Sequence, residues 1–139
     1  MSKLVAVQGC TVEYDLPDDS LGSVELIAAV STASSKVQSG GKKAYKDKIT
    51  ITVTGGSVSV TTPPPGGTNP GAVPPGSIKI NGTSAKNTTN GDKYVLEGDE
   101  GEATFECMFA PATGTSPVPG NVKIRAKVTS ANQSVLKVT

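Results

Sequence analysis

The sequence predicts an all-β protein: a single compact domain of short antiparallel strands and hairpins with a long Pro/Gly-rich loop. Valine, isoleucine and threonine far outnumber leucine and methionine, and their branched β-carbons favour pleated strands over helices. The 139 residues include 16 Gly and 10 Pro, a composition rich in turns. Apolar and polar residues also alternate strictly in three segments, as expected for strands with one buried face.

The clearest alternation lies at 48–54, 103–109 and 122–128. In these segments the residues predicted to face the core are Ile49, Ile51 and Val53, then Phe105, Cys107 and Phe109, then Val122, Ile124, Ala126 and Val128. Weaker strand candidates are Leu4–Val7, Thr11–Tyr14, Val24–Val30, Val58–Thr61, Ile78–Ile80, Tyr94–Leu96 and Val135–Val138. The stretch VELIAAV also fits one or two helical turns, but its valines and its alternation favour a strand.

The segment TTPPPGGTNPGAVPPGS contains six prolines and four glycines in seventeen residues. Because a proline has no N–H to donate to a ladder, this segment is not expected to form a central strand. Residues 62–76 are therefore predicted to be a loop. This loop could also separate two small domains, but flanks of about 60 residues each would be marginal alone, so residues 1–139 are predicted to form one domain.

Composition argues against several classes of protein. The net charge of +1 does not suit a nucleic-acid-binding protein, which neutralises phosphates with Lys and Arg. Three Tyr, two Phe and no Trp are too few for a base-stacking platform, and they argue against a glycosidase, whose cleft needs placed aromatics to hold the sugar. No apolar run is long enough to span a membrane. The opening MSKLVAVQGC is too short and too interrupted for a secretory signal, so folding in a cytoplasm is expected. No catalytic constellation stands out, and an enzyme is the most distant hypothesis.

Cys10 and Cys107 are the two cysteines, and the chain has no histidine. In a reducing compartment they are expected to be free, buried thiols, with a disulfide as the alternative. Without histidine they lack the partners of a zinc site. No metal and no other cofactor is predicted.

Three groups of charged residues invite a sharper interpretation. The run EGDEGE at 97–102 carries carboxylates that calcium could use, although its spacing does not follow an EF-hand and a solvated acidic turn is the alternative. The stretch YDLPDDS at 14–20 is interpreted in the same way. Lys123, Arg125 and Lys127 form a basic row that could meet an acidic partner or could simply face solvent.

The stretch SIKINGTSAKNTTNGDK at 77–93 is the candidate contact site. Ile78, Lys79 and Ile80 predict a strand, and Asn81-Gly82 predicts a tight turn of the primed type, because Asn and Gly both tolerate positive φ. A second turn is expected at Asn90-Gly91-Asp92. The predicted hairpin, with Ile78, Lys79, Ile80, Asn81 and Gly82, could contact a partner or could be an ordinary surface hairpin.

The same stretch resembles the repeating unit of PAAR and PAAR-like proteins, in which a short strand ends in an Asn-Gly turn, continues through small residues and closes near a Gly-Asp. LVAVQGC near the start looks like the opening of PAAR-like proteins, and VKIRAKVTSANQSVLKV near the end is similar to their closing hairpin. The likeness covers about a third of the chain. Many family members bind a metal at the apex through histidines, which this chain lacks.

The resemblance implies a structural protein that caps the trimeric β-helical spike of a phage tail or contractile injection machine, with one copy per trimer. It also implies transient contact with a target membrane, and a virion or injection-particle component made in a bacterial cytoplasm. A weak echo between 35–48 and 78–93 fits the pseudo-symmetry that such a cap would need. The alternative is an Ig-like β-sandwich that serves as a decoration or carbohydrate-binding module.

Overall fold

The computed structural model describes residues 3–19, 21–33, 35, 37–84 and 93–138. These residues form eleven strands and no helix, which confirms the all-β prediction. The strands are β1 (Lys3–Leu4), β2 (Thr11–Asp15), β3 (Ser23–Val30), β4 (Gln38–Ser39), β5 (Lys42–Lys43), β6 (Lys48–Ser59), β7 (Gly67–Ala72), β8 (Gly76–Asn81), β9 (Glu100–Pro111), β10 (Val118–Ser130) and β11 (Lys137–Val138).

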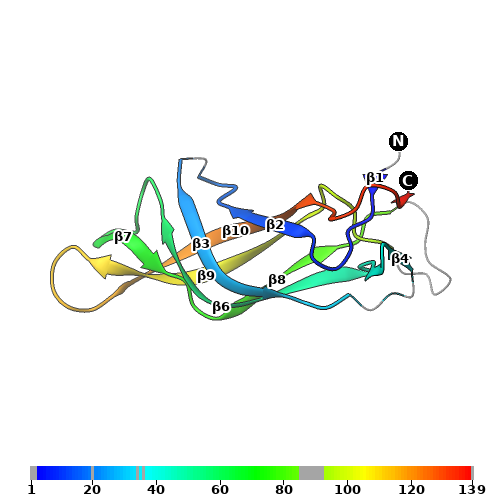
Figure 1. The fold of residues 1–139 in the computed structure, drawn as a ribbon. Coiled ribbons are helices and arrows are strands. Elements are labelled where there is room, and N and C mark those ends of the chain that lie inside the picture. Colours follow the sequence, from blue (N-terminus) through cyan, green and yellow to red (C-terminus); the bar gives the residue numbers. More distant parts are fainter. Residues whose placement is uncertain (1–2, 20, 34, 36, 85–92, 139) are drawn as a thin grey trace.

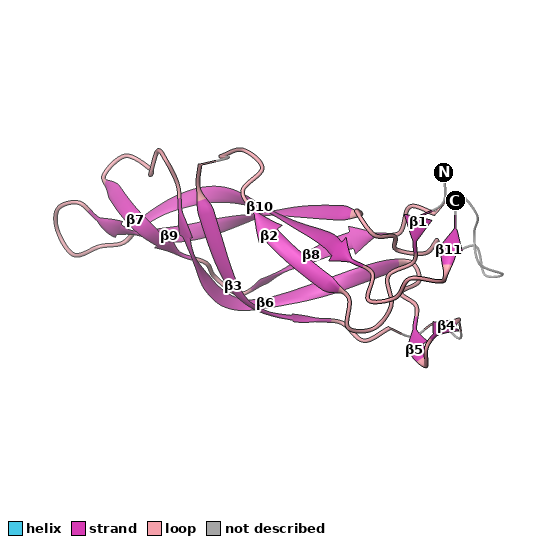
Figure 2. Ribbon diagram, turned by 45° about the horizontal axis from the view of Figure 1, so that its top comes forward, coloured by secondary structure: helices cyan, strands magenta, loops and turns pink. Residues whose placement is uncertain are grey.

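Seven strands form one antiparallel sheet in the order β2-β10-β9-β7-β6-β3, with β8 also paired to β6. One edge of β6 pairs with β3, while its other edge is shared by β8, at Lys48–Val53, and by β7, at Ser57–Val58. The sheet therefore folds back on itself: β3, β6 and β8 lie in one layer, β2, β10 and β9 lie in the other, and β7 joins them (Figures 1 and 2). The strands β2 and β3 are the two ends of the sheet, and they approach one another, so that the sheet nearly closes into a barrel.

The core fills the space between the two layers. Every core position predicted from the three alternating segments is buried, from Ile49 at full burial to Val122 at 9% exposed. Ile78 and Ile80 on β8 complete this core from the same layer as β6. Because inward and outward residues alternate along a strand, the pattern of these segments was sufficient to assign their faces.

The strand β6 is longer than expected. The segments 48–54 and 58–61, predicted as separate strands, are joined through Gly55-Gly56 into β6, which continues to Ser59. Opposite β3 the register shifts between Ile27 and Ala28, and the unpaired residue, Thr54, belongs to β6. This is a β-bulge, in which one extra residue bends the strand and increases its local twist. VELIAAV, the stretch that also fitted a helix, is the strand β3.

The prediction that 62–76 forms a loop without a central strand was wrong. The strand β7 lies within it and pairs with both β6 and β9. Pro70 is tolerated because the β7–β9 register is interrupted between Thr68 and Gly71, so the missing N–H falls where the ladder has a gap. The side chain of Asn69 replaces part of the ladder, accepting from Val60 N at 2.9 Å and donating to Val60 O at 2.7 Å.

The ring of Phe109 explains why this strand is so rich in glycine. A Cβ at Gly71 would lie 2.8 Å from the ring, and one at Gly120 would lie 3.1 Å from it. A Cβ at Gly67 would lie 3.1 Å from the Cβ of Phe109 and 3.2 Å from the side chain of Pro64. Phe109 itself is 1% exposed. The three glycines therefore form a cage that admits the ring between β7 and β10.

A second, smaller cluster lies at the end of the molecule that carries both termini, opposite the β9–β10 hairpin (Figure 1). It is formed by Val5, Val7, Ala44 and Leu96, with Tyr94 and Leu136 packed against it. Isolated bridges and the β1–β11 pair replace the strands expected at 4–7, 94–96 and 135–138. The side-chain amide of Gln133 connects the first and last segments of the described chain, because it donates to the carbonyls of Val5 and Leu136 at 2.8 Å each.

We predict that Gly71→Ala lowers the free energy of unfolding by about 1–3 kcal/mol, because the added methyl overpacks the ring of Phe109. Gly55→Ala is the matched control, since its Cβ would have only an ordinary contact, at 4.0 Å. Urea unfolding of both variants measures the difference. Equal stabilities would contradict the glycine cage.

Candidate functional site

The five residues of the predicted contact hairpin lie at the end of β8. Ile78 and Ile80 are fully buried in the core, so they hold β8 to β6. Lys79 and Asn81 point outward and are exposed. Lys79 and Asn81 are therefore the two members of this group whose side chains are open to a partner.

The predicted turn at Asn81-Gly82 was wrong. Asn81 pairs with Lys48 in the β6–β8 ladder, and the N–H of Gly82 continues the pairing by donating to Asp47 O at 2.7 Å. Neither Asn81 nor Gly82 has a positive φ. A Cβ at Gly82 would lie 2.5 Å from the carbonyl oxygen of Lys93. Glycine therefore allows two backbone segments to lie closer together here than a side chain would permit.

The echo between 35–48 and 78–93 has no common structure in its described parts. Gly40-Gly41, both with positive φ, turn β4 into β5 as a small separate hairpin. The matching part of the second copy is a strand of the main sheet. The second predicted turn, Asn90-Gly91-Asp92, lies outside the described residues.

The four acidic side chains of the run at 97–102 do not form one site. Asp99 is buried and accepts from Leu96 N at 2.8 Å and from the Thr83 hydroxyl at 2.5 Å. Glu97 accepts from Ala131 N at 3.2 Å. Glu100 and Glu102 lie on the outer face of β9. No three acidic, cysteine or histidine side chains converge in the described part of the chain.

The basic row on β10 lies between two acidic strands. Arg125 donates to both oxygens of Asp15 on β2, and its Nε lies 3.6 Å from Glu100 on β9. Lys123 lies 3.7 Å from Asp18 and 4.0 Å from Glu102. These pairs laterally connect the strands of one layer. The row is therefore largely engaged within the chain and offers little free positive charge to an acidic partner.

Both cysteines are free, as predicted. Cys107 is fully buried between Phe105 and Phe109 on the inward face of β9, and Cys10 is half-buried beside the core. Burial raises the pKa of each thiol to about 11. Since the thiolate is the reactive form, neither cysteine is suited to nucleophilic chemistry.

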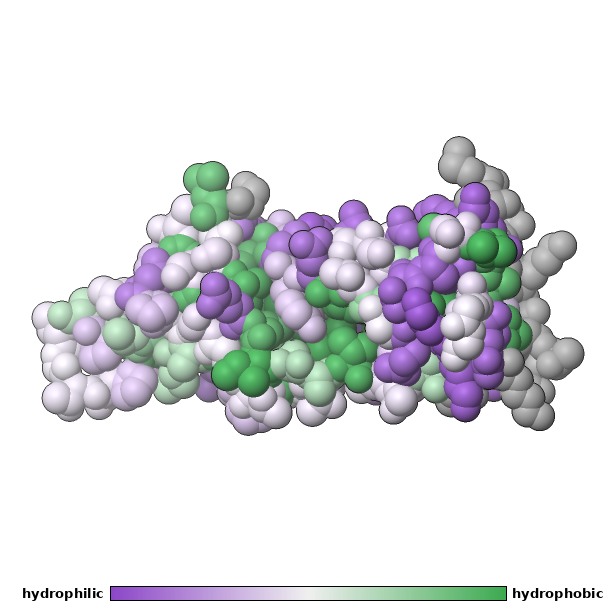
Figure 3. Space-filling model, viewed as in Figure 1, coloured by the Kyte–Doolittle hydropathy of each residue, from purple (hydrophilic) through white to green (hydrophobic). Residues whose placement is uncertain are grey.

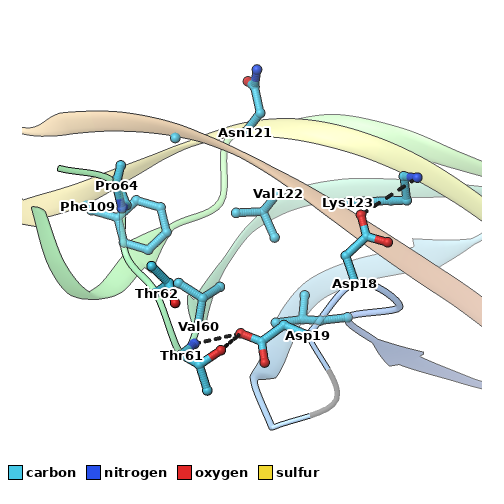
Figure 4. A pocket seen from close by; sticks show the side chains of 12 residues that line it. Asp18, Asp19, Val60, Thr61, Thr62, Pro64, Phe109, Asn121, Val122 and Lys123 are labelled. Carbon is cyan, nitrogen blue, oxygen red and sulfur yellow. Dashed lines mark hydrogen bonds and ion pairs between the residues drawn. The ribbon is translucent and has the colours of Figure 1, made fainter.

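A hollow of about 360 Å³ opens between the β2–β3 loop, the segment after β6 and the start of β10 (Figure 4). Its floor is apolar and includes Val60, Phe109 and Val122, while Asp18 and Lys123 pair at its rim. Asp19 binds Thr61 through both the backbone N–H, at 2.6 Å, and the hydroxyl, at 2.7 Å. Because the ring of Phe109 is 1% exposed, the hollow offers no aromatic face for a sugar to stack on.

The free edge of β3 is a feature that sequence reasoning missed. Ile27 is 69% exposed in the middle of this strand, and Val30 is 37% exposed at its end. The outer positions of β3 and of the neighbouring β6 carry few charges; apolar and near-neutral residues gather over the middle of the face in Figure 3, where β3 and β6 run in Figure 1. The signal was present in VELIAAV, where apolar residues occupy both faces of the strand.

Searches of protein-family models, curated proteins and solved structures give no significant match to this chain. No helical segment in the described residues has the length and apolar character to cross a bilayer.

We expect Asp15→Asn to lower stability by about 0.2–1 kcal/mol near neutral pH, the usual contribution of an exposed ion pair. The hydrogen bonds from Arg125 hold the pKa of Asp15 below its ordinary value of 3.8. A lowered pKa stabilises the folded state above the ordinary pKa, and this contribution disappears as pH falls through the folded value.

Urea unfolding from pH 7 to pH 2 measures this effect. The difference between wild type and Asp15→Asn should shrink below about pH 4, whereas Glu13→Gln on the same strand should give no comparable loss. A difference that is independent of pH would contradict the role of the Asp15–Arg125 pair.

We also predict slow labelling of both cysteines by iodoacetamide near pH 8. With a pKa of about 11, each thiol is far less ionised at pH 8 than an ordinary cysteine, and Cys107 should react more slowly than Cys10 because it is fully buried. In denaturing urea the two rates should become equal. Rapid modification of both thiols in the native protein would contradict this.

Proposed function

We propose that this chain is a non-catalytic structural component of a phage tail or contractile injection particle. The observation that carries the proposal is the charge-poor end strand β3, which pairs only with β6 among the described strands and exposes Ile27, and so offers an apolar contact surface to a β-rich partner. Nothing comparable supports an enzyme: both cysteines have raised pKa values, and each acidic side chain of 97–102 is engaged or lies on an open face.

The specific form of the proposal is a cap on the blunt end of a trimeric β-helical spike, with one chain per trimer and transient contact with the target membrane. It draws on the resemblance of 78–93 and of the first residues to PAAR-like proteins. Backbone pairing supplies such a contact without a conspicuous patch of side chains. The particle component would be made in a bacterial cytoplasm and would need no cofactor.

The second candidate is a β-sandwich decoration module. The observation that favours it is the two-layered arrangement of the main sheet, which differs from a cone of hairpins and is close to a sandwich. A carbohydrate-binding version has less support, because the ring at the floor of the hollow is covered.

Mass measurement of the chain mixed with a trimeric spike encoded beside it distinguishes these candidates. One chain bound per trimer is the result expected for a cap, and an unrelated trimeric β-helical protein is the control. Failure to bind the spike, together with binding to the particle's shell protein, would overturn the cap in favour of the decoration module.

A further inference from the structure

Positive charge gathers at the end of the molecule that carries both termini (Figure 1). This end is formed by residues 3–10, 37–46 and 131–138, in which every charged residue is a lysine. Four of these lysines are exposed and form no ion pair with a described residue, and they are called the basic end here: Lys3, Lys42, Lys43 and Lys137. Two carboxylates border it, Asp47 and the half-buried Glu97. The net charge of +1 therefore includes a local excess of positive charge.

Backbone pairing and hydrogen bonds bring the segments of the basic end together. The Nζ of Lys42 donates to the carbonyl of Asn132 at 3.1 Å, so β5 lies beside the segment that leads into β11. Lys43 follows in the same strand. The strand β1 pairs with β11, which places Lys3 and Lys137 on neighbouring strands. The four lysines therefore share one end of the fold although they come from three distant parts of the sequence.

An exposed aliphatic side chain lies beside these lysines. Val135 is 82% exposed and stands two positions before Lys137. The Oε1 of Gln133 accepts from the N–H of Val135 at 2.8 Å and from that of Leu136 at 2.7 Å, so one side chain fixes this turn. Leu136 packs against the smaller core cluster, while Val135 stays in water. A single exposed apolar residue is ordinary, but one held next to several lysines is the combination found in segments that bind membrane surfaces.

We propose that the basic end binds the surface of an anionic lipid bilayer, with its lysines at the headgroups and Val135 inserted between them. Clustered lysines are attracted by the negative surface potential of such a bilayer, and burial of an apolar side chain at the boundary with the acyl chains adds to the binding. This inference goes beyond the function proposed above, which assigns no residue to a membrane contact.

An acidic protein and a nucleic acid fit this end less well. Contacts between proteins are enriched in aromatic residues and Arg and depleted in Lys. The one arginine of the chain, Arg125, lies on β10 and is bound to Asp15, and the aromatic residue of the basic segments, Tyr45, is buried. A nucleic acid would be held by the lysines but would gain little from Val135. Lysines on flexible side chains suit headgroups that can move to meet them.

Co-sedimentation of the chain with lipid vesicles tests the proposal. The chain should bind vesicles that contain phosphatidylserine, should not bind vesicles of phosphatidylcholine alone, and should be released by high salt, which screens the attraction. Joint replacement by Lys42→Glu and Lys43→Glu should lower the affinity more than about tenfold. Lys79→Glu with Lys127→Glu is the matched control, because it changes the net charge equally at exposed positions of β8 and β10 and should keep most of the binding.

Val135→Ser distinguishes a bilayer from other anionic partners. It should weaken binding to the phosphatidylserine vesicles, whereas Leu21→Ser, at an equally exposed side chain in the β2–β3 loop, should not. The proposal would be overturned by a lack of vesicle binding, by equal losses in the two charge variants, by no effect of Val135→Ser, or by tighter binding to a DNA duplex than to the vesicles. Circular dichroism confirms that each variant is folded. Because the vesicles are tested with the chain alone, spike binding without vesicle binding would overturn this inference and leave the cap intact.

Discussion

The ring of Phe109 sets a constraint on which the two-layered sheet depends. Phe109 lies on β9, and it is enclosed by glycines of β7 and β10 and by Pro64 from the segment that leads into β7. Only residues without a side chain can approach the ring so closely from two strands. The Gly/Pro-rich composition of 62–76 is therefore a packing requirement as well as a source of turns: it brings β7 between β6 and β9 and so joins the two layers.

The sequence was sufficient to predict the parts of the fold that depend on local alternation. The segments around Ile51, Cys107 and Ile124 needed no knowledge of their neighbours, because a strand with one buried face repeats every two residues. It was insufficient for β7 and for Asn81-Gly82. A glycine can be needed either for a positive φ or for a close contact with another segment. The second role cannot be seen in the local sequence, because it depends on a distant partner: Phe109 for Gly71, and the Lys93 carbonyl for Gly82.

The candidate site was harder to predict for a related reason. Whether a strand lies at the end of a sheet is a property of topology, and nothing in the composition of β3 states that only β6 pairs with it. The charges were equally dependent on register: Lys123 and Arg125 look like an unbound basic row until β2 and β9 are placed on either side. The one signal in the sequence was VELIAAV, in which apolar residues occupy the outward face of the strand as well as the face that packs on the core.

The outer faces of the two layers differ in how they meet water. On the outer face of the β2-β10-β9 layer, Lys123 and Arg125 form ion pairs with neighbouring carboxylates, and this charged face is readily solvated. The β3-β6-β8 layer exposes Ile27 on an end strand with a single charged residue, and water solvates this apolar side chain poorly. Association through backbone groups places little demand on side-chain identity. If the proposed contact is of this kind, it would leave only a short and weak signature in the sequence, because the side chains at such a contact can vary.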